Sequence, residues 1–294
     1  MKKAFRGFVG FVLKFVPDPN YVYNVILKPR PLRYVTDKIL SLIISESVTL
    51  PEGTLYLNPA DPGGSASLAL GKYELFETQI LRSVLHPGMS VVNIGANIGY
   101  YVVVSSKHVG ESGKVLAFEP DPRLFAILSK SASALKNVEI RQEAVSDKEG
   151  QMTLYLSDLG MRENTLVPVT YMKNHISVKT VPLDSLIQKV DLIIMDIEGA
   201  EPFAFAGMSK LLDQKNMAIL CELNPKLIKI GGNDPVKMLT MLASHGFEIY
   251  NINAKDNKLE KISDFAGFVE PFTKNEELTN IYCAKGTAAS ENIF

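Results

Sequence analysis

From residue 90 onward, short apolar runs alternate with stretches that have the period of a helix. The apolar runs, rich in Val, Ile and Leu, are residues 90–94, 114–118, 138–143, 190–195 and 217–222. Their length and composition predict strands buried on both faces of a sheet. The helical stretches are residues 98–108, 122–135, 183–189, 201–212 and 234–245. This alternation predicts βαβ units, and therefore a doubly wound α/β fold with a mostly parallel sheet.

Several further segments depart from the alternation. Residues 150–157 and 178–181 predict two extra strands inserted after the third apolar run. Residues 247–251 and 281–284 predict two tail strands separated by a polar loop. Residues 70–85 have a helical period and precede the first strand of the sheet.

The first 70 residues lack this pattern, so we expect an N-terminal extension over 1–70 and a main domain over 71–294. Residues 1–16 predict a basic amphipathic helix. Such a helix has two uses, and the sequence leaves both open. It packs on its own domain or on a second subunit of a homo-oligomer, or it lies peripherally on an anionic membrane surface. A transmembrane helix needs about 20 consecutive apolar residues, and the sequence contains no such run.

Composition and charge narrow the class of protein further. The 31 Lys and Arg residues nearly balance the 32 Asp and Glu residues, so the net charge of -1 gives no reason to expect a nucleic-acid partner. The two cysteines, Cys221 and Cys283, each lie in an apolar run, which excludes a disulfide scaffold and a cysteine-rich zinc site. These features favour a cytoplasmic protein.

A turn containing two glycines follows the first predicted strand, with the sequence N-I-G-A-N-I-G over residues 93–99. Gly95 and Gly99 let the backbone approach a ligand closely, and the next helix offers free N–H groups there. Glu119 follows Gly99 by twenty residues and ends the second strand, where an acid typically binds ribose hydroxyls. The middle glycine of the dinucleotide motif is missing, which counts against NAD. The turn therefore predicts a nucleoside-containing cofactor.

Carboxylates also follow the fourth and fifth predicted strands. Asp196, Glu198, Glu201 and Glu222 are expected at the edge of the sheet where parallel strands end and ligands bind. Glu201 also suits the start of the next helix. Residues 161–165 lie in a segment expected to cover the cleft at this edge.

Four motifs together carry a resemblance to a known family. N-I-G-A-N-I-G-Y-Y at 93–101, F-E-P-D at 118–121, A-V-S-D at 144–147 and M-D-I-E-G-A-E at 195–201 resemble, in order, the motifs of the FkbM family of S-adenosylmethionine-dependent methyltransferases. The resemblance spans residues 73–224. It implies a seven-stranded class I methyltransferase sheet of the Rossmann-like kind, and methyl transfer that is usually directed to a hydroxyl oxygen.

The resemblance also assigns positions to the cofactor S-adenosylmethionine. It implies contacts from Asn93, Gly95, Ala96, Asn97, Gly99, Glu119, Pro120, Asp121, Glu143, Ala144 and Asp196, with Glu119 on the ribose and Glu143 and Ala144 near the adenine. Two positions depart from the family pattern. Asn93 stands where the family usually has Asp, and Val102 where it usually has Thr. An amide brings no charge to hold the amino group of the methionine.

Methyl transfer to a hydroxyl requires alignment of donor and acceptor and removal of a proton. Asp196 is the first candidate for this base, followed by Glu198 or Glu222. Mg²⁺ held by the same carboxylates is an alternative without a specific motif, so we expect no metal ligand. The acceptor that the resemblance implies is a small molecule, sugar, glycan or natural product. Two other functions stay open: a non-catalytic cofactor-binding or membrane-associated scaffold, and a nicotinamide-dependent dehydrogenase.

Overall fold

The computed structural model of the 294-residue chain describes residues 44–58, 61–157 and 161–290. The amphipathic helix predicted over residues 1–16 lies outside these ranges. Within them, no helix has both the length and the apolar character needed to cross a bilayer.

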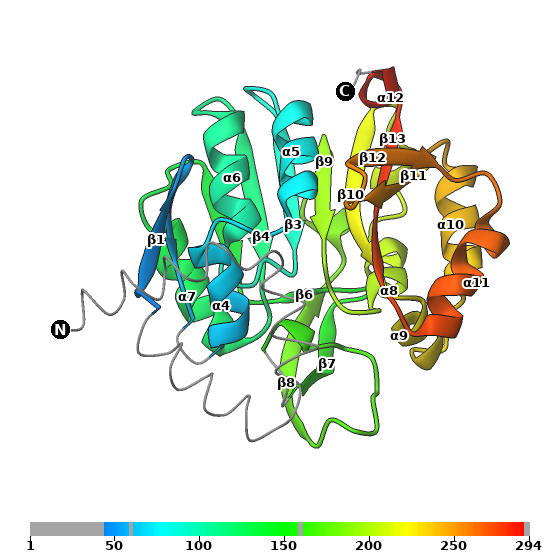
Figure 1. Cartoon of the computed structure of the whole chain (residues 1–294), viewed down its shortest axis with the longest axis horizontal. Coiled ribbons are helices and arrows are strands. Elements are labelled where there is room, and N and C mark those ends of the chain that lie inside the picture. Colours follow the sequence, from blue (N-terminus) through cyan, green and yellow to red (C-terminus); the bar gives the residue numbers. More distant parts are fainter. Residues whose placement is uncertain (1–43, 59–60, 158–160, 291–294) are drawn as a thin grey trace.

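A central sheet of eight strands organises the described residues (Figure 1), in the order β12-β11-β13-β10-β9-β3-β4-β5. The strands are β3 (Ser90–Ile94), β4 (Lys114–Phe118), β5 (Val138–Arg141), β9 (Leu192–Met195), β10 (Met217–Leu223), β11 (Glu248–Asn253), β12 (Lys258–Lys261) and β13 (Thr279–Lys285). The five strands from β10 to β5 pair in parallel, while β13 runs antiparallel between β10 and β11. The predicted doubly wound, mostly parallel α/β class is confirmed, with one strand more than the expected seven.

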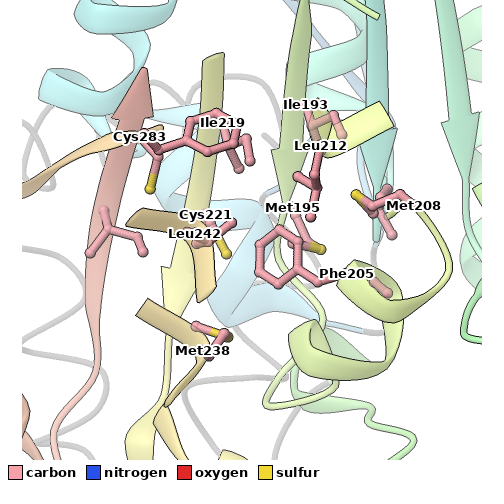
Figure 2. Packing of buried hydrophobic residues seen from close by; sticks show 14 of the residues in the cluster. Ile193, Met195, Phe205, Met208, Leu212, Ile219, Cys221, Met238, Leu242 and Cys283 are labelled. Atoms are coloured by element: carbon pink, nitrogen blue, oxygen red, sulfur yellow. The ribbon is translucent and has the colours of Figure 1, made fainter. Parts of the chain in front are cut away.

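Helices cover both faces of this sheet, and each strand sends alternate side chains to the two sides. In β9, Leu192 and Ile194 pack under α5 (Leu75–Val84), α6 (Tyr100–Val109) and α7 (Pro122–Ala132). Ile193 and Met195 face the other side, which is covered by α8 (Glu201–Ala206), α9 (Pro225–Ile230), α10 (Pro235–Ser244) and α11 (Phe265–Asn275). Figure 2 shows this second core. Burial on both faces explains why these strands are continuous apolar runs in the sequence.

Both cysteines lie in the core that Figure 2 shows. Cys221 is in β10 and Cys283 is in β13, and both thiols are free and buried. The prediction that excluded a disulfide scaffold is therefore confirmed.

Two helices predicted from the sequence are shorter in the structure. The helix predicted over 183–189 is only a 3-10 turn, Leu183–Ser185, because too few residues precede β9 for a stable helix. The helix predicted over 201–212 ends at Ala206, and a 3-10 turn, Leu211–Asp213, follows it. Gly207 ends that helix where the chain touches Ser146, since an added Cβ would lie 1.9 Å from the Ser146 carbonyl oxygen.

The prediction of a polar loop between the two tail strands is also wrong, because the segment between β11 and β13 contains β12 and α11. Strand β12 has the sequence K-L-E-K and one apolar residue, and α11 contains Pro271 inside the helix. Strand β12 therefore carries no strong periodic signal, whereas α11 has apolar residues at helical spacing, Phe265, Phe268, Val269 and Phe272, which the prediction of a loop overlooked. The strand adds a charged edge beyond β11.

A smaller sheet lies at the end of the central sheet where the parallel strands finish (Figure 1). It consists of β6 (Ala144–Val145), β8 (Asn174–Val181) and β7 (Gly150–Leu156), in that order. The extra strands predicted at 150–157 and 178–181 belong to it. Its apolar side chains pack against Ala200 and Ile197, so the insertion is fixed beside the turn that follows β9.

The described residues before the main sheet pack on two of the helices that cover it, α6 and α7. β1 (Ser47–Leu50) pairs with β2 (Gly53–Tyr56), and α4 (Pro62–Ala69) follows, while the short α12 (Thr287–Ser290) ends the described chain. Leu55 and Leu57 pack with Val103 of α6 and Leu124 of α7. The domain boundary expected at residue 70 stays a prediction.

The contact between the turns after β3 and β9 depends on Gly95. This residue has φ +79°, and a Cβ there would lie 2.0 Å from the Asp196 carbonyl oxygen. Real side chains do not tolerate such an approach, so only glycine allows the two strand ends to meet.

We expect Gly95→Ala to lower the free energy of unfolding by roughly 3 kcal/mol or more, through backbone strain and this clash. Gly110→Ala is the matched control, because Gly110 also has a positive φ of +64° but has no atom within 4 Å of the added Cβ. That variant should cost only about 1 kcal/mol. Urea unfolding of both variants measures the difference, and equal losses would contradict the packing argument.

Candidate functional site

The turn over residues 95–99 is hydrogen-bonded to the end of the neighbouring strand β4. The N–H groups of Gly95 and Ala96 donate to the Phe118 carbonyl oxygen, at 3.0 and 2.8 Å. Asn97, with φ +52°, presents its own N–H toward Glu119. The turn after β3 and the end of β4 therefore form one rigid wall.

Glu119 is the polar centre of that wall. Its carboxylate accepts hydrogen bonds from the N–H groups of Asn97, at 2.8 Å, and Asp121, at 2.9 Å. The side chain is buried, and burial raises the pKa of Glu119 to about 7, although the two backbone hydrogen bonds lower it. Each carboxylate oxygen keeps a lone pair for a further donor, so the group can still bind hydroxyls of a ligand.

A hollow of about 580 Å³ opens beside Glu119. The predicted cofactor residues that line it are Gly95, Asn97, Glu119, Pro120, Glu143, Ala144 and Asp196. Met161, Asn164, Thr165 and Leu166 close it from the segment expected to cover the cleft. Apolar walls with a few polar groups suit a nucleoside. We call this space the first hollow.

A second hollow of about 630 Å³ lies on the other side of the same turn. Its lining shares Gly95, Asn97 and Asp196 with the first hollow and adds the predicted residues Asn93 and Ala96. It also includes Tyr100 and Tyr101, which end the motif over residues 93–101, and four residues that the sequence did not suggest: Asn58, Asp61, Ser65 and Tyr73. These four precede the main sheet, and the Asp-Pro start of α4 was their one local signal.

Two of the predicted cofactor residues line neither hollow. An added Cβ on Gly99 would lie 2.8 Å from Leu128, so this glycine allows α6 to pack on α7. Asp121 is fully buried; its carboxylate caps α7, pairs with Arg123 at 2.6 Å and accepts a hydrogen bond from Asn164 at 2.8 Å. Asp121 thus holds Asn164 in the wall of the first hollow.

Three carboxylates meet at the carboxyl ends of β9 and β10. Asp196, Glu198 and Glu222 offer carboxylate oxygens that all lie within 4.8 Å of one another. Burial and the neighbouring carboxylates raise the pKa of Glu198 and Glu222 well above the ordinary value. The raised pKa values favour the retention of a proton within the group, and the oxygen donors also suit a divalent cation such as Mg²⁺.

Glu201 lies behind this group and is fully buried at the start of α8. Its carboxylate accepts a hydrogen bond from the Gly199 N–H at 3.2 Å, and burial raises its pKa to about 7. Its position fits a role in starting the helix and adds negative charge behind the three-carboxylate group.

The segment expected to cover the cleft, residues 161–165, is hydrogen-bonded to the backbone of Glu198. The Thr165 hydroxyl donates to the Glu198 carbonyl oxygen at 2.7 Å, and Thr165 also pairs with Tyr155 of β7 through two backbone hydrogen bonds. His175 is an exposed residue of β8, and the centroid of its ring lies 6.2 Å from that of Tyr155. It lines neither hollow.

Comparisons with known proteins point to one family. The profile of the methyltransferase FkbM domain matches residues 93–249. A protein-L-isoaspartate O-methyltransferase of Triticum aestivum is 27% identical over 42% of this chain and 53% of its own length. The 2-O-methyltransferase NoeI of Sinorhizobium fredii is 28% identical over 46% of this chain and 63% of its own length.

Among solved structures, the methyltransferase FkbM from Methylobacillus flagellatus KT is 13% identical, with a TM-score of 0.45. The match covers 86% of this chain and 60% of that one. The chain spans about half the length of the wheat relative, 53%, and 63% of NoeI.

The buried carboxylates predict how stability depends on pH. The pKa of Glu119 and that of Glu201 are about 7 in the folded chain against 4.5 as the ordinary value. Between these two values the folded chain keeps protons that the unfolded chain releases, so the free energy of unfolding should fall as pH rises. Each such group contributes a slope of at most roughly 1.4 kcal/mol per pH unit.

We expect urea unfolding between pH 5 and pH 8 to show this decline, and Glu201→Gln to make it shallower. Glu277→Gln, at an exposed carboxylate, is the control and should leave the slope unchanged. A free energy of unfolding that rises over this pH range would contradict the assignment.

Proposed function

The chain belongs to the FkbM methyltransferase family, and we propose that it transfers a methyl group from S-adenosylmethionine to a hydroxyl oxygen of its acceptor. One observation carries this proposal. Two hollows share the Gly95–Asn97 turn and Asp196; the Glu119 carboxylate lies in the first, and Asp196 also belongs to the three-carboxylate group with Glu198 and Glu222. An elongated cofactor with a nucleoside at one end and an amino acid at the other suits this division.

The first hollow suits the adenosine. Glu119 retains acceptor capacity for the ribose hydroxyls, and Glu143 and Ala144 lie where the adenine would be bound. The second hollow suits the methionine end. When bound, S-adenosylmethionine supplies a methyl group on a sulfonium sulfur, and an oxygen nucleophile takes this methyl group by in-line displacement, with the thioether as the leaving group.

The acceptor hydroxyl needs a base, and the three-carboxylate group supplies one. Asp196 lines both hollows and is the first candidate, with Glu198 and Glu222 beside it. One oxygen of Glu222, Oε1, is buried and has no hydrogen-bond partner among the described residues. A buried carboxylate in this state gains from taking up a proton, or from a bound cation. Mg²⁺ is therefore the alternative use of the same oxygens.

The acceptor is proposed to be a hydroxyl on a sugar, glycan or natural product. The similarity to NoeI, a 2-O-methyltransferase, supports transfer to oxygen. Tyr171 provides an exposed aromatic surface, since 59% of the residue is accessible. Partial burial raises its pKa, and Glu163 and Glu198 raise it further, which places its hydroxyl close to the carboxylates. An exposed ring beside carboxylates suits a polyhydroxylated ring.

We expect isothermal titration with S-adenosylhomocysteine to give micromolar binding, and NAD to give none. Glu119→Gln should weaken S-adenosylhomocysteine by about 10-fold or more, because it removes a charge-assisted hydrogen bond to the ribose. Glu139→Gln, at an exposed carboxylate of the neighbouring β5, is the matched control. Unchanged affinity in Glu119→Gln would remove the ribose assignment.

Turnover tests the carboxylate group. With an acceptor found by screening hydroxylated glycans and natural products, Glu222→Gln should lower kcat by roughly 10²-fold or more while binding of S-adenosylhomocysteine changes little. EDTA distinguishes the two uses of the group. Turnover that survives EDTA supports the base, and turnover that stops and returns with Mg²⁺ supports the cation. Normal kcat in Glu222→Gln would exclude both roles for Glu222.

A further inference from the structure

Glu74 occupies an unusual position at the start of α5. Its backbone is left-handed, with φ 40°, and its side chain does not cap its own helix. By contrast, the cap residues Asp61, Asp121, Asn224, Asp234 and Asp264 each accept a hydrogen bond from an N–H of their own helix. Strained residues of this kind persist where the surrounding structure uses them.

The Glu74 carboxylate is bound by aromatic residues of the second hollow. The Tyr101 hydroxyl donates to Glu74 Oε2, and Tyr73 also hydrogen-bonds to this carboxylate. Tyr73 and Tyr101 both line the second hollow, together with Asn93 and Asp196. Burial is the largest cause, and the nearby Asp196 carboxylate the second, of a rise in the pKa of Glu74 to about 7. The carboxylate therefore lies directly behind the tyrosine wall.

The second hollow is short of compensating positive charge. Among the residues that the structure describes, its lining includes Asp61 and Asp196 but neither Lys nor Arg. Asn93 also lines it and carries no charge. A buried carboxylate behind such a wall gains from a cationic ligand group, because burial without a partner is costly. An ammonium group is the matching ligand chemistry, since it has three donors and no acceptor.

We infer that Tyr101 and Glu74 form the subsite for the ammonium group at the methionine end of the cofactor, an assignment that rests on the proposed function. The Tyr101 hydroxyl donates its hydrogen bond to Glu74, so the lone pairs of its oxygen can accept an ammonium N–H. Glu74 acts through Tyr101 and is a positioning residue. It supplies, from α5, the negative charge that Asn93 in β3 does not carry.

Two ligands separate this subsite from the rest of the pocket. S-adenosylhomocysteine has the ammonium group and no sulfonium charge, while 5′-methylthioadenosine keeps the adenosine and thioether but lacks the amino acid. Glu74→Gln should weaken S-adenosylhomocysteine on the order of 10- to 100-fold, as expected for a charge-assisted interaction. It should change the affinity for 5′-methylthioadenosine by less than about threefold, which is the scatter expected when no contact is lost.

Glu77→Gln is the matched control, because Glu77 is a buried glutamate one turn further along α5 and is bound by Asn280 at 3.0 Å. It should leave the ratio of the two affinities unchanged. Circular dichroism of each variant verifies the fold. An equal loss for both ligands in Glu74→Gln, or no loss for either, would overturn the inference.

A double-mutant cycle with Tyr101→Phe gives a second measurement that needs only S-adenosylhomocysteine. If Glu74 acts through Tyr101, the double variant should lose no more affinity than the larger single loss. Additive losses would separate the two residues and refute the subsite. If the unmodified protein binds neither ligand, the proposed function fails along with the inference; if it binds both and only the variant pattern is wrong, the inference alone fails.

Discussion

The close contact between the turns after β3 and β9 is the constraint on which the site depends. Gly95 meets the carbonyl oxygen of Asp196 with no room for a side chain. This contact divides the space at the sheet edge into two hollows that share the same turn. It also fixes Asp196 at the junction of both. The position of the candidate base relative to the cofactor is therefore a result of backbone packing rather than of side-chain flexibility.

Negative charge accumulates around this junction. Glu74, Glu119, Glu198, Glu201 and Glu222 all have a raised pKa, and burial is the largest cause for each. Within residues 44–58, 61–157 and 161–290, no lysine or arginine lines either hollow. Burying several ionised carboxylates together costs free energy unless bound protons or a cationic ligand neutralise their charge. The proposed donor carries positive charge at its sulfonium and ammonium groups, and its demethylated product lacks the former.

Sequence patterns predicted what is local and what is buried on both faces. The bounds of β3 and β4 were predicted residue for residue, because a doubly buried strand is a continuous apolar run. Glu119 was found because it ends a strand at a fixed distance from the glycine turn. Tyr73 and Glu74 were not found, because they belong to the segment before the sheet, and no motif or strand end in the sequence links that segment to the site. Strand β12, with one apolar residue, left no signal.

The outermost strands of the central sheet have a consequence for association between copies of this chain. At one edge β12 carries Lys258, Glu260 and Lys261, and at the other β5 carries Glu139 and Arg141. Charged side chains on edge strands oppose the addition of a further strand, since a pairing partner would have to desolvate them. The sheet is thus protected against growing into a continuous intermolecular ribbon. Among the described residues, the surfaces left for contact between copies are those of the helices and of the smaller sheets.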